Sequence, residues 1–275
     1  MSYTATILAD SVSPGDARLM TLEITFPRIV LAELNTHRML SRNAASSRAI
    51  PVKKLLEEVR TNPFIPEEWG RNQSGMQAGE PLDAETSRWA RQRWMSARAE
   101  AMLHAESLAA GGVHKQLANR LLEPFQWCTA IVSATEWSNF LALRTHPDAQ
   151  PEIQRVAVLV REALASSTPK PLAMGEWHLP LTPDRAELDA AFDIEAIKRI
   201  SAGRCARVSY LTHHGERDPQ ADIDLCDRLV SSGHLSPLEH VATPARIGTP
   251  AFHGNFRGWV SLRKRVPNED DFSRR

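Results

Sequence analysis

Cysteines and long apolar runs are scarce in this sequence, and their scarcity excludes several classes of protein. Only three cysteines occur among 275 residues, namely Cys128, Cys205 and Cys226, and no C-x-x-C pair is present. An odd number of widely spaced cysteines is typical of reduced thiols rather than of a disulfide framework or a zinc knuckle. No segment approaches the roughly 20 apolar residues of a membrane span, and the N-terminus lacks the pattern of a secretion signal. We therefore expect a cytoplasmic protein with no structural metal and no membrane contact.

Net charge is also absent, because 33 basic and 33 acidic side chains cancel. No global field draws the molecule to nucleic acid, so polynucleotide binding is not expected and any anion site must be local. The hydrophobic fraction of 42% is that of a globular protein with a substantial core. We expect one domain over residues 1–275, with an insertion around residues 60–95.

Three motifs for known ligands are missing as well. Neither G-x-G-x-x-G nor G-x-x-x-x-G-K-[ST] occurs, which removes the main support for a dehydrogenase or a P-loop ATPase. The phrase GHLSPLEH holds His234 and His240, but Pro237 breaks any helix that could align them, unlike the H-E-x-x-H metal motif. This phrase is more typical of a turn that presents His234 and Ser236 to a polar ligand than of a metal site.

Apolar periodicity predicts a mixture of strands and helices. Residues 19–26 alternate as a strand does, and residues 29–34 are apolar enough for a buried helix or a second strand. Asp83 is placed to cap a long helix that Gly111 and Gly112 would end. Further elements are expected as helices at 52–60, 115–122, 136–143, 152–166 with Asp148 as its cap, 194–202 and 221–231, and as a strand at 240–247. Without regular alternation of strands and helices, the fold class is α+β, a mixed α/β single domain with a long helical segment.

The segment from His37 to Arg48 concentrates polar chemistry directly after an apolar element. It contains one histidine, three arginines, three serines and an asparagine. Arginine forks make paired hydrogen bonds to phosphate or carboxylate, and hydroxyls and backbone N–H groups fill the remaining acceptor sites. A solvated connecting loop has the same composition, so the residues alone leave an anion site and a loop equally open.

Three arginines stand among apolar residues elsewhere, namely Arg120, Arg144 and Arg207. The stem of such an arginine must lie against the core while its guanidinium finds an anion or a carboxylate. Taken singly, each is more often paired with a structural Asp or Glu than with a ligand.

Five segments resemble the signature blocks of the flavin-dependent thymidylate synthases. Thr36-His37-Arg38, seven residues and Ser46-Ser47-Arg48 are similar to the first of these blocks, which reads Arg-His-Arg, seven residues, Ser and Gly-Arg. The other four segments are ANRLLEP with Arg120, NFLALRTHPDAQ with Asn139 and Arg144, ARVSY with Ser209, and GHLSPLEH with His234 and Ser236. In the family the last two blocks precede the first, so the chain resembles a circularly permuted or partly duplicated member.

The resemblance implies an α+β fold of that family, a homotetramer with sites between subunits, and the conversion of dUMP to dTMP. It implies FAD as cofactor, with NADPH as reductant and methylenetetrahydrofolate as carbon donor. The residues implied to surround FAD are His37, Arg38, Asn43, Asn139, Ser209, His234 and Ser236. Those implied to hold the pyrimidine deoxynucleotide are Glu33, Ser46, Ser47, Arg48, Arg120 and Arg144, with Arg120 and Ser46 catalytic and Arg120 able to polarise the base.

Several positions depart from the family pattern and keep other functions open. Thr36 replaces an arginine, Ala44 a glutamate and Glu33 a glutamine, while Ser133-Ala134-Thr135 replaces an Asn-Ala-Arg phrase. A carboxylate at position 33 can accept from the exocyclic amine of cytosine but cannot donate to uracil. The alternative function is therefore a flavin-dependent hydroxymethylase, hydroxylase or methylase of another pyrimidine nucleotide such as dCMP, for modified DNA. A third possibility, from another class, is an inactive nucleotide-binding scaffold.

Overall fold

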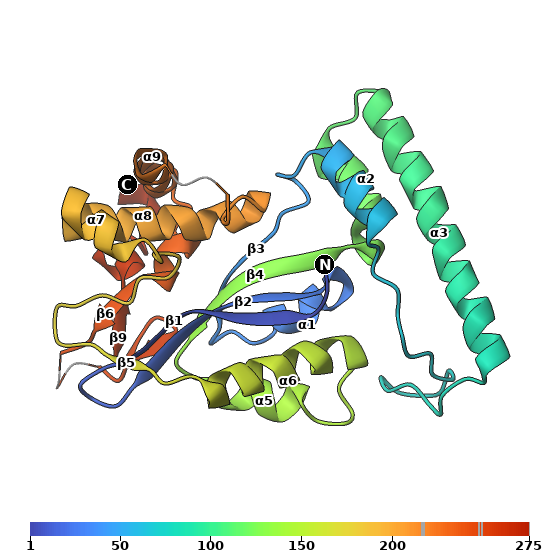
Figure 1. The fold of residues 1–275 in the computed structure, drawn as a ribbon, viewed down its shortest axis with the longest axis horizontal. Helices are drawn as coiled ribbons and strands as arrows, with labels where there is room; N and C mark the ends of the chain where they lie inside the picture. Colours follow the sequence, from blue (N-terminus) through green and yellow to red (C-terminus); the bar gives the residue numbers. More distant parts are fainter. Residues whose placement is uncertain (216–217, 247, 249, 275) are drawn as a thin grey trace.

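A five-stranded sheet organises the molecule in the computed structural model, which describes residues 1–215, 218–246, 248 and 250–274 (Figure 1). The strands are β1 (Thr4–Val12), β2 (Arg18–Pro27), β3 (Ser41–Ala44), β4 (Trp127–Ala134) and β5 (Lys170–Pro171). Their order across the sheet is β3-β4-β2-β1-β5, and every pairing is antiparallel except that of β1 with β5.

One face of the sheet is apolar, because alternate residues of β2 point the same way. Met20, Leu22, Ile24 and Phe26 form this face with residues of β4, and all four are buried. The helices α1 (Leu31–Asn35), α5 (Ser138–Arg144) and α6 (Pro151–Ser166) pack against it. Each such side chain contributes roughly 1.5–3 kcal/mol on burial, so this layer forms the main core.

The opposite face of the sheet is partly polar and is covered by the C-terminal third of the chain. Thr21, Glu23 and Thr25 lie between the apolar residues of β2, and Ile131 on β4 contacts Cys205 and other C-terminal core residues. The covering elements include α8 (Ile194–Ala206) and the 3-10 helices η3 (Arg207–Tyr210) and η4 (Ser236–His240). Polar groups that face this interior layer must find partners there.

A second, smaller core lies beyond the end of the sheet, where α2 (Val52–Thr61) packs beside α3 (Ala84–Ala110) (Figure 1). The side chain of Asp83 accepts hydrogen bonds from the backbone N–H groups of Glu85 and Thr86, as an N-cap does. After α3 the left-handed residue is Gly112, with φ of +81°. The chain then passes through α4 (Lys115–Ala118) and η2 (Asn119–Phe125) into β4.

Two of the remaining elements, α7 (Arg185–Ala191) and α9 (Pro219–Ser231), pack against α8. The others are β6 (Ala242–Pro244), β7 (Phe252–His253), β8 (Phe256–Arg257), β9 (Trp259–Ser261), η5 (Leu262–Arg265) and η6 (Phe272–Arg274), together with η1 (Arg28–Val30), which joins β2 to α1. The backbones of α8 and α9 approach closely at Gly203, where an added Cβ would stand 2.2 Å from the carbonyl oxygen of Asp222. Glycine therefore lets the two helices meet.

The predicted α+β fold class is confirmed, and so are the strand at 19–26 and the helices at 52–60, 136–143, 152–166, 194–202 and 221–231, within a few residues at their ends. The helix expected at 115–122 is α-helical only over Lys115–Ala118 and continues as the 3-10 helix η2. Residues 29–34 form a 3-10 turn and α1, so the helical alternative was the right one. Asp148 does not cap α6, whose N-cap residue is Gln150 with no side-chain cap bond. The strand expected at 240–247 is shorter, because His240 still belongs to η4 and only Ala242–Pro244 pairs with β9; Ile247 lies outside the described residues. None of the described helices is long and apolar enough to span a bilayer.

Candidate functional site

A cavity of about 340 Å³ brings together residues that lie far apart in the sequence. His37 and Arg38 follow α1, while Asn139 lies in the first turn of α5 about a hundred residues later, and all three line the cavity. Phe252 of β7 closes one wall, and Arg257 stacks 5.1 Å from its ring while also pairing with Glu136 at 2.9 Å. The C-terminal hairpin therefore completes a cavity that the N-terminal half begins.

Arg144 fixes the histidine of this cavity. Its Nε donates to Nε2 of His37 at 2.9 Å, and its Nη1 pairs with Oε2 of Glu33 at 2.8 Å. Burial, together with the charge of Arg144, lowers the pKa of His37 below its ordinary value. Because Nε2 accepts a hydrogen bond, the ring proton of neutral His37 lies on Nδ1.

The GHLSPLEH segment, which stands in an unexpected order relative to the His37 segment, meets that segment in space at β3. The amide of Asn43 lies 3.2 Å from Oγ of Ser236 and 3.0 Å from Nε2 of His240, although 193 and 197 residues separate them. The amide orientation that satisfies both contacts directs nitrogen to His240 and oxygen to Ser236. Tertiary packing therefore places the GHLSPLEH segment beside the segment that follows His37.

From Asn43 a hydrogen-bonded chain of side chains runs across the interior face of the sheet. Its members in order are His240, Ser133 (2.8 Å), Thr21 (2.6 Å), His178 (2.8 Å) and Ser11 (2.9 Å). One direction of donation satisfies every member if each histidine is neutral. Burial lowers the pKa of both His178 and His240 to about 3, in agreement with neutral rings.

A third group of polar residues centres on Glu123. Its Oε1 accepts from Oγ of Ser47 at 2.7 Å, and it pairs with Arg120 at 2.7 Å and Arg28 at 3.0 Å. Burial raises the pKa of Glu123, but the Ser47 hydrogen bond and the two arginines outweigh burial, so the pKa lies below its ordinary value. Arg120 is thus held by a carboxylate while its side chain stays about half exposed, at 48%.

The other residues predicted for the site are spread around these three groups. The backbone N–H of Ser46 donates to the carbonyl of Ser209 at 3.0 Å, so η3 touches the start of the serine segment. Arg48 is exposed, and the described residues offer it no ion pair. His234 bonds Ser232 beside it at 3.0 Å and does not line the cavity at His37. A single chain therefore brings His37, Arg38 and Asn139 together in one cavity. It also places Asn43 against Ser236 at a separate position.

Arg207 pairs with a structural carboxylate, which is the role that the sequence favoured over ligand binding. Its Nε pairs with Oδ1 of Asp222 at 2.5 Å, and Oδ2 of the same carboxylate bonds Nε of Arg204 at 3.0 Å. Asp184 adds two bonds to Arg204, at 2.6 and 2.8 Å. These ion pairs join α8 to α9 and hold the segment before Ser209.

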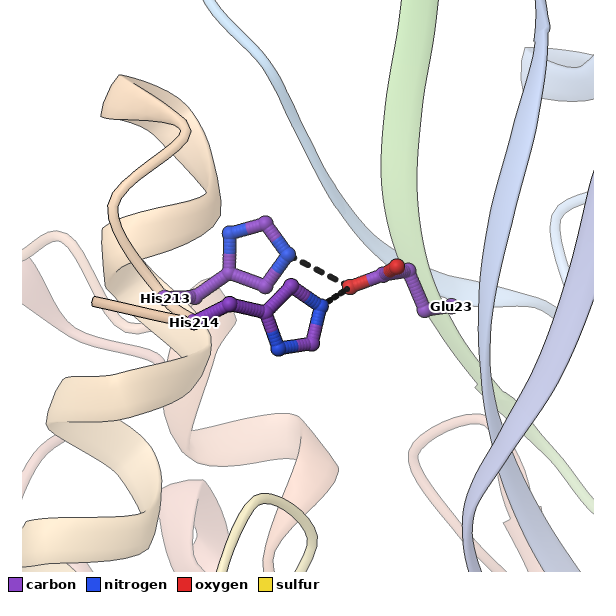
Figure 2. Close-up of side chains that lie close together, drawn as sticks. All are labelled: Glu23, His213 and His214. Carbon is purple, nitrogen blue, oxygen red and sulfur yellow. Dashed lines mark hydrogen bonds and ion pairs between the residues drawn. The ribbon is translucent and has the colours of Figure 1, made fainter. Parts of the chain in front are cut away.

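Two adjacent histidines were missed by the sequence analysis. Nε2 of His213 and Nε2 of His214 lie 2.5 and 2.7 Å from the same carboxylate oxygen of Glu23 on β2, as Figure 2 shows. Burial raises the pKa of Glu23, but the hydrogen bond and charge of His213 and the charge of His214 outweigh it, so the pKa is lowered. The His-His pair was visible in the sequence, whereas Glu23, 190 residues earlier, was not a recognisable partner.

The α+β fold carries a cavity beside the main sheet that histidine, arginine, asparagine and phenylalanine side chains line. The chain belongs to the thymidylate synthase complementing protein family, because the profile of that family matches residues 7–170. Among curated proteins none matches the chain significantly. The family match ends before Ser209 and Ser236, so the two C-terminal blocks lie outside it.

Solved structures of similar fold include two of a UMP/dUMP methylase, PolB, from Streptomyces cacaoi. The complex with 5-Br UMP has a TM-score of 0.50 at 16% identity, covering 60% of this chain and 89% of that one. The complex with 5-Br dUMP has a TM-score of 0.48 at 16% identity, covering 60% and 90%. At this identity the first likeness supports the fold alone.

Proposed function

We propose that this protein transfers a one-carbon unit to C5 of a pyrimidine deoxynucleotide, with dUMP converted to dTMP and a flavin as cofactor. The observation that supports it best is the meeting of His37, Arg38 and Asn139 in one cavity. These residues come from two blocks that resemble the flavin-dependent thymidylate synthases, and both blocks lie within the matched family segment. Methylation of UMP or dUMP is named for a protein of similar fold, and we adopt that substrate class only as part of the proposal.

The cavity fits part of a flavin. Its volume of about 340 Å³ is at the lower end for small-molecule pockets, which suits one ring system rather than a whole dinucleotide. The exposed Arg38 offers guanidinium donors, Asn139 an amide and Phe252 an aromatic wall. A bound FAD would supply the reducing electrons for the one-carbon transfer. The rest of FAD would extend beyond this cavity, consistent with a homotetramer whose sites lie between subunits.

The protein's own residues would then orient and polarise the substrates. Arg144 holds His37 with Nε2 as acceptor, which presents the Nδ1 proton in a fixed direction. We assign Arg120, which pairs with Glu123, to polarise the pyrimidine base. Ser46 and Arg48 are assigned to bind the nucleotide. NADPH and methylenetetrahydrofolate complete the proposed reaction as reductant and carbon donor.

Titration with FAD and a turnover assay test the function. The protein should change the absorbance of FAD on binding, and with reduced flavin and methylenetetrahydrofolate it should add mass to dUMP. Asn139→Ala should weaken FAD binding about fivefold to tenfold, because one hydrogen bond in the cavity is lost. Asn72→Ala, in the exposed segment after α2, is the matched control and should bind as the unaltered protein does. Absence of any flavin binding would exclude the proposal.

The assay should compare dUMP with dCMP, because Glu33 was expected to read the base. The structure gives that carboxylate another partner, Arg144. We therefore expect Glu33→Gln to weaken the binding of dUMP and dCMP by the same factor, about fivefold, since its effect passes through Arg144. Calorimetric titration of both nucleotides measures the ratio. A ratio that shifts toward dUMP in the variant would instead support base reading and the dCMP alternative.

A further inference from the structure

Three potential metal ligands converge where the C-terminal third of the chain covers the sheet. Their donor atoms, one carboxylate oxygen of Glu23 and one imidazole nitrogen each from His213 and His214, all lie within 4.8 Å of one another. His213 and His214 lie in a turn, and their ring centroids are 4.3 Å apart. Figure 2 shows both rings directed at the one carboxylate.

The arrangement matches the donor set of a zinc site in kind and in size. Zinc takes imidazole nitrogen and carboxylate oxygen at about 2.0–2.2 Å, so tetrahedral ligand atoms stand about 3.3 Å apart. The N···O separations of 2.5 and 2.7 Å would open by less than about 1 Å to admit the ion. His214 is on the surface, with a side chain 58% exposed, and its ring can make this adjustment.

We propose that Glu23, His213 and His214 bind one Zn²⁺ ion, with the fourth position open to water on the exposed side of His214. The expectation of no metal came from the cysteine count and the GHLSPLEH phrase, and neither bears on this cluster. The ion would join β2 to the segment that directly follows η3. In η3 the carbonyl of Ser209 accepts from the N–H of Ser46, so the ion would hold the ARVSY segment against the sheet.

The affinity expected for this site is moderate. Nδ1 of His213 is buried, and none of the described residues offers it a hydrogen bond. Metal-bound histidines usually gain about 10–100-fold in affinity from such an outer partner. We therefore expect a dissociation constant in the micromolar rather than the nanomolar range.

The test is a titration of chelator-treated full-length protein with Zn²⁺ by calorimetry and with Co²⁺ by visible absorption. One ion should bind per chain, and Co²⁺ should give the intense band of a four-coordinate ion. Zn²⁺ at about 100 times its dissociation constant should raise the melting temperature by about 5 °C. None of these readouts requires flavin or turnover, so their failure is distinct from failure of the proposed function.

Two single variants separate this site from adventitious binding. Glu23→Gln keeps the shape of a partly buried residue, and His214→Ala removes an exposed ring, so both should fold. Each should weaken Zn²⁺ binding at least about tenfold and abolish the shift in melting temperature. His104→Ala removes an exposed histidine on α3 and should change neither. Absence of binding, or equal affinity in Glu23→Gln, His214→Ala and the unaltered protein, would overturn the proposal.

Discussion

Lowering the pH from 7 to 5 should reduce the free energy of unfolding by about 4 kcal/mol, measured by urea denaturation at each pH. The cause is the pair of buried histidines, His178 and His240, whose pKa values lie at about 3 in the folded protein against an unperturbed value of 6.5. Below pH 6.5 the two histidines bind protons in the unfolded chain but stay neutral in the folded chain. The free energy of unfolding therefore decreases as the pH is lowered. Each histidine contributes about 2 kcal/mol over this interval.

Single variants assign this pH dependence to its source. His178→Gln should remove about half of the change in unfolding free energy between pH 7 and 5, because one depressed pKa is lost. His104→Gln, an exposed histidine on α3, should leave the change intact. A pH dependence of less than about 1 kcal/mol in the unaltered protein would show that these rings are not held neutral.

Replacing Asp222 with alanine should cost about 3 kcal/mol of unfolding free energy. The side chains of Asp222 and Arg204 are only 2% and 1% exposed, so the variant leaves a buried guanidinium without one of its carboxylates. The cost lies at the lower end of the range for a broken buried pair because Asp184 still holds Arg204. Arg207 loses its partner at the same time.

Chemical denaturation of Asp222→Ala and of a matched control measures this cost. Asp189 on α7 also pairs with an arginine, Arg185, but their side chains are 51% and 41% exposed. Asp189→Ala should therefore cost less than about 1 kcal/mol. Equal effects of the two substitutions would mean that the Asp222 network is no more important than a surface ion pair.

Local patterns in the sequence were sufficient for several elements of the fold. The alternation of β2, the cap at Asp83 and the glycines after α3 each depend on residues close in the chain, and each appears where it was predicted. Of the strands in the main sheet, β1, β3, β4 and β5 were missed. β4 is buried along almost its whole length and so shows no alternation of apolar and polar residues, while β1 is mostly half-buried and lacks a clear apolar face.

The composition of the segment from His37 to Arg48 left an anion site and a loop equally open; the resemblance of its motif favoured the site, which stays a prediction. The sequence by itself determined the α+β class, the family and the candidate residues His37, Arg38 and Asn139. Only the tertiary structure decided that Arg144 meets Glu33 and that Arg207 meets Asp222. It also decided that Glu23 faces His213 and His214, and that Ser236 meets Asn43. These pairs join residues up to about 190 positions apart, and such contacts depend on how helices and strands pack, which no local pattern encodes.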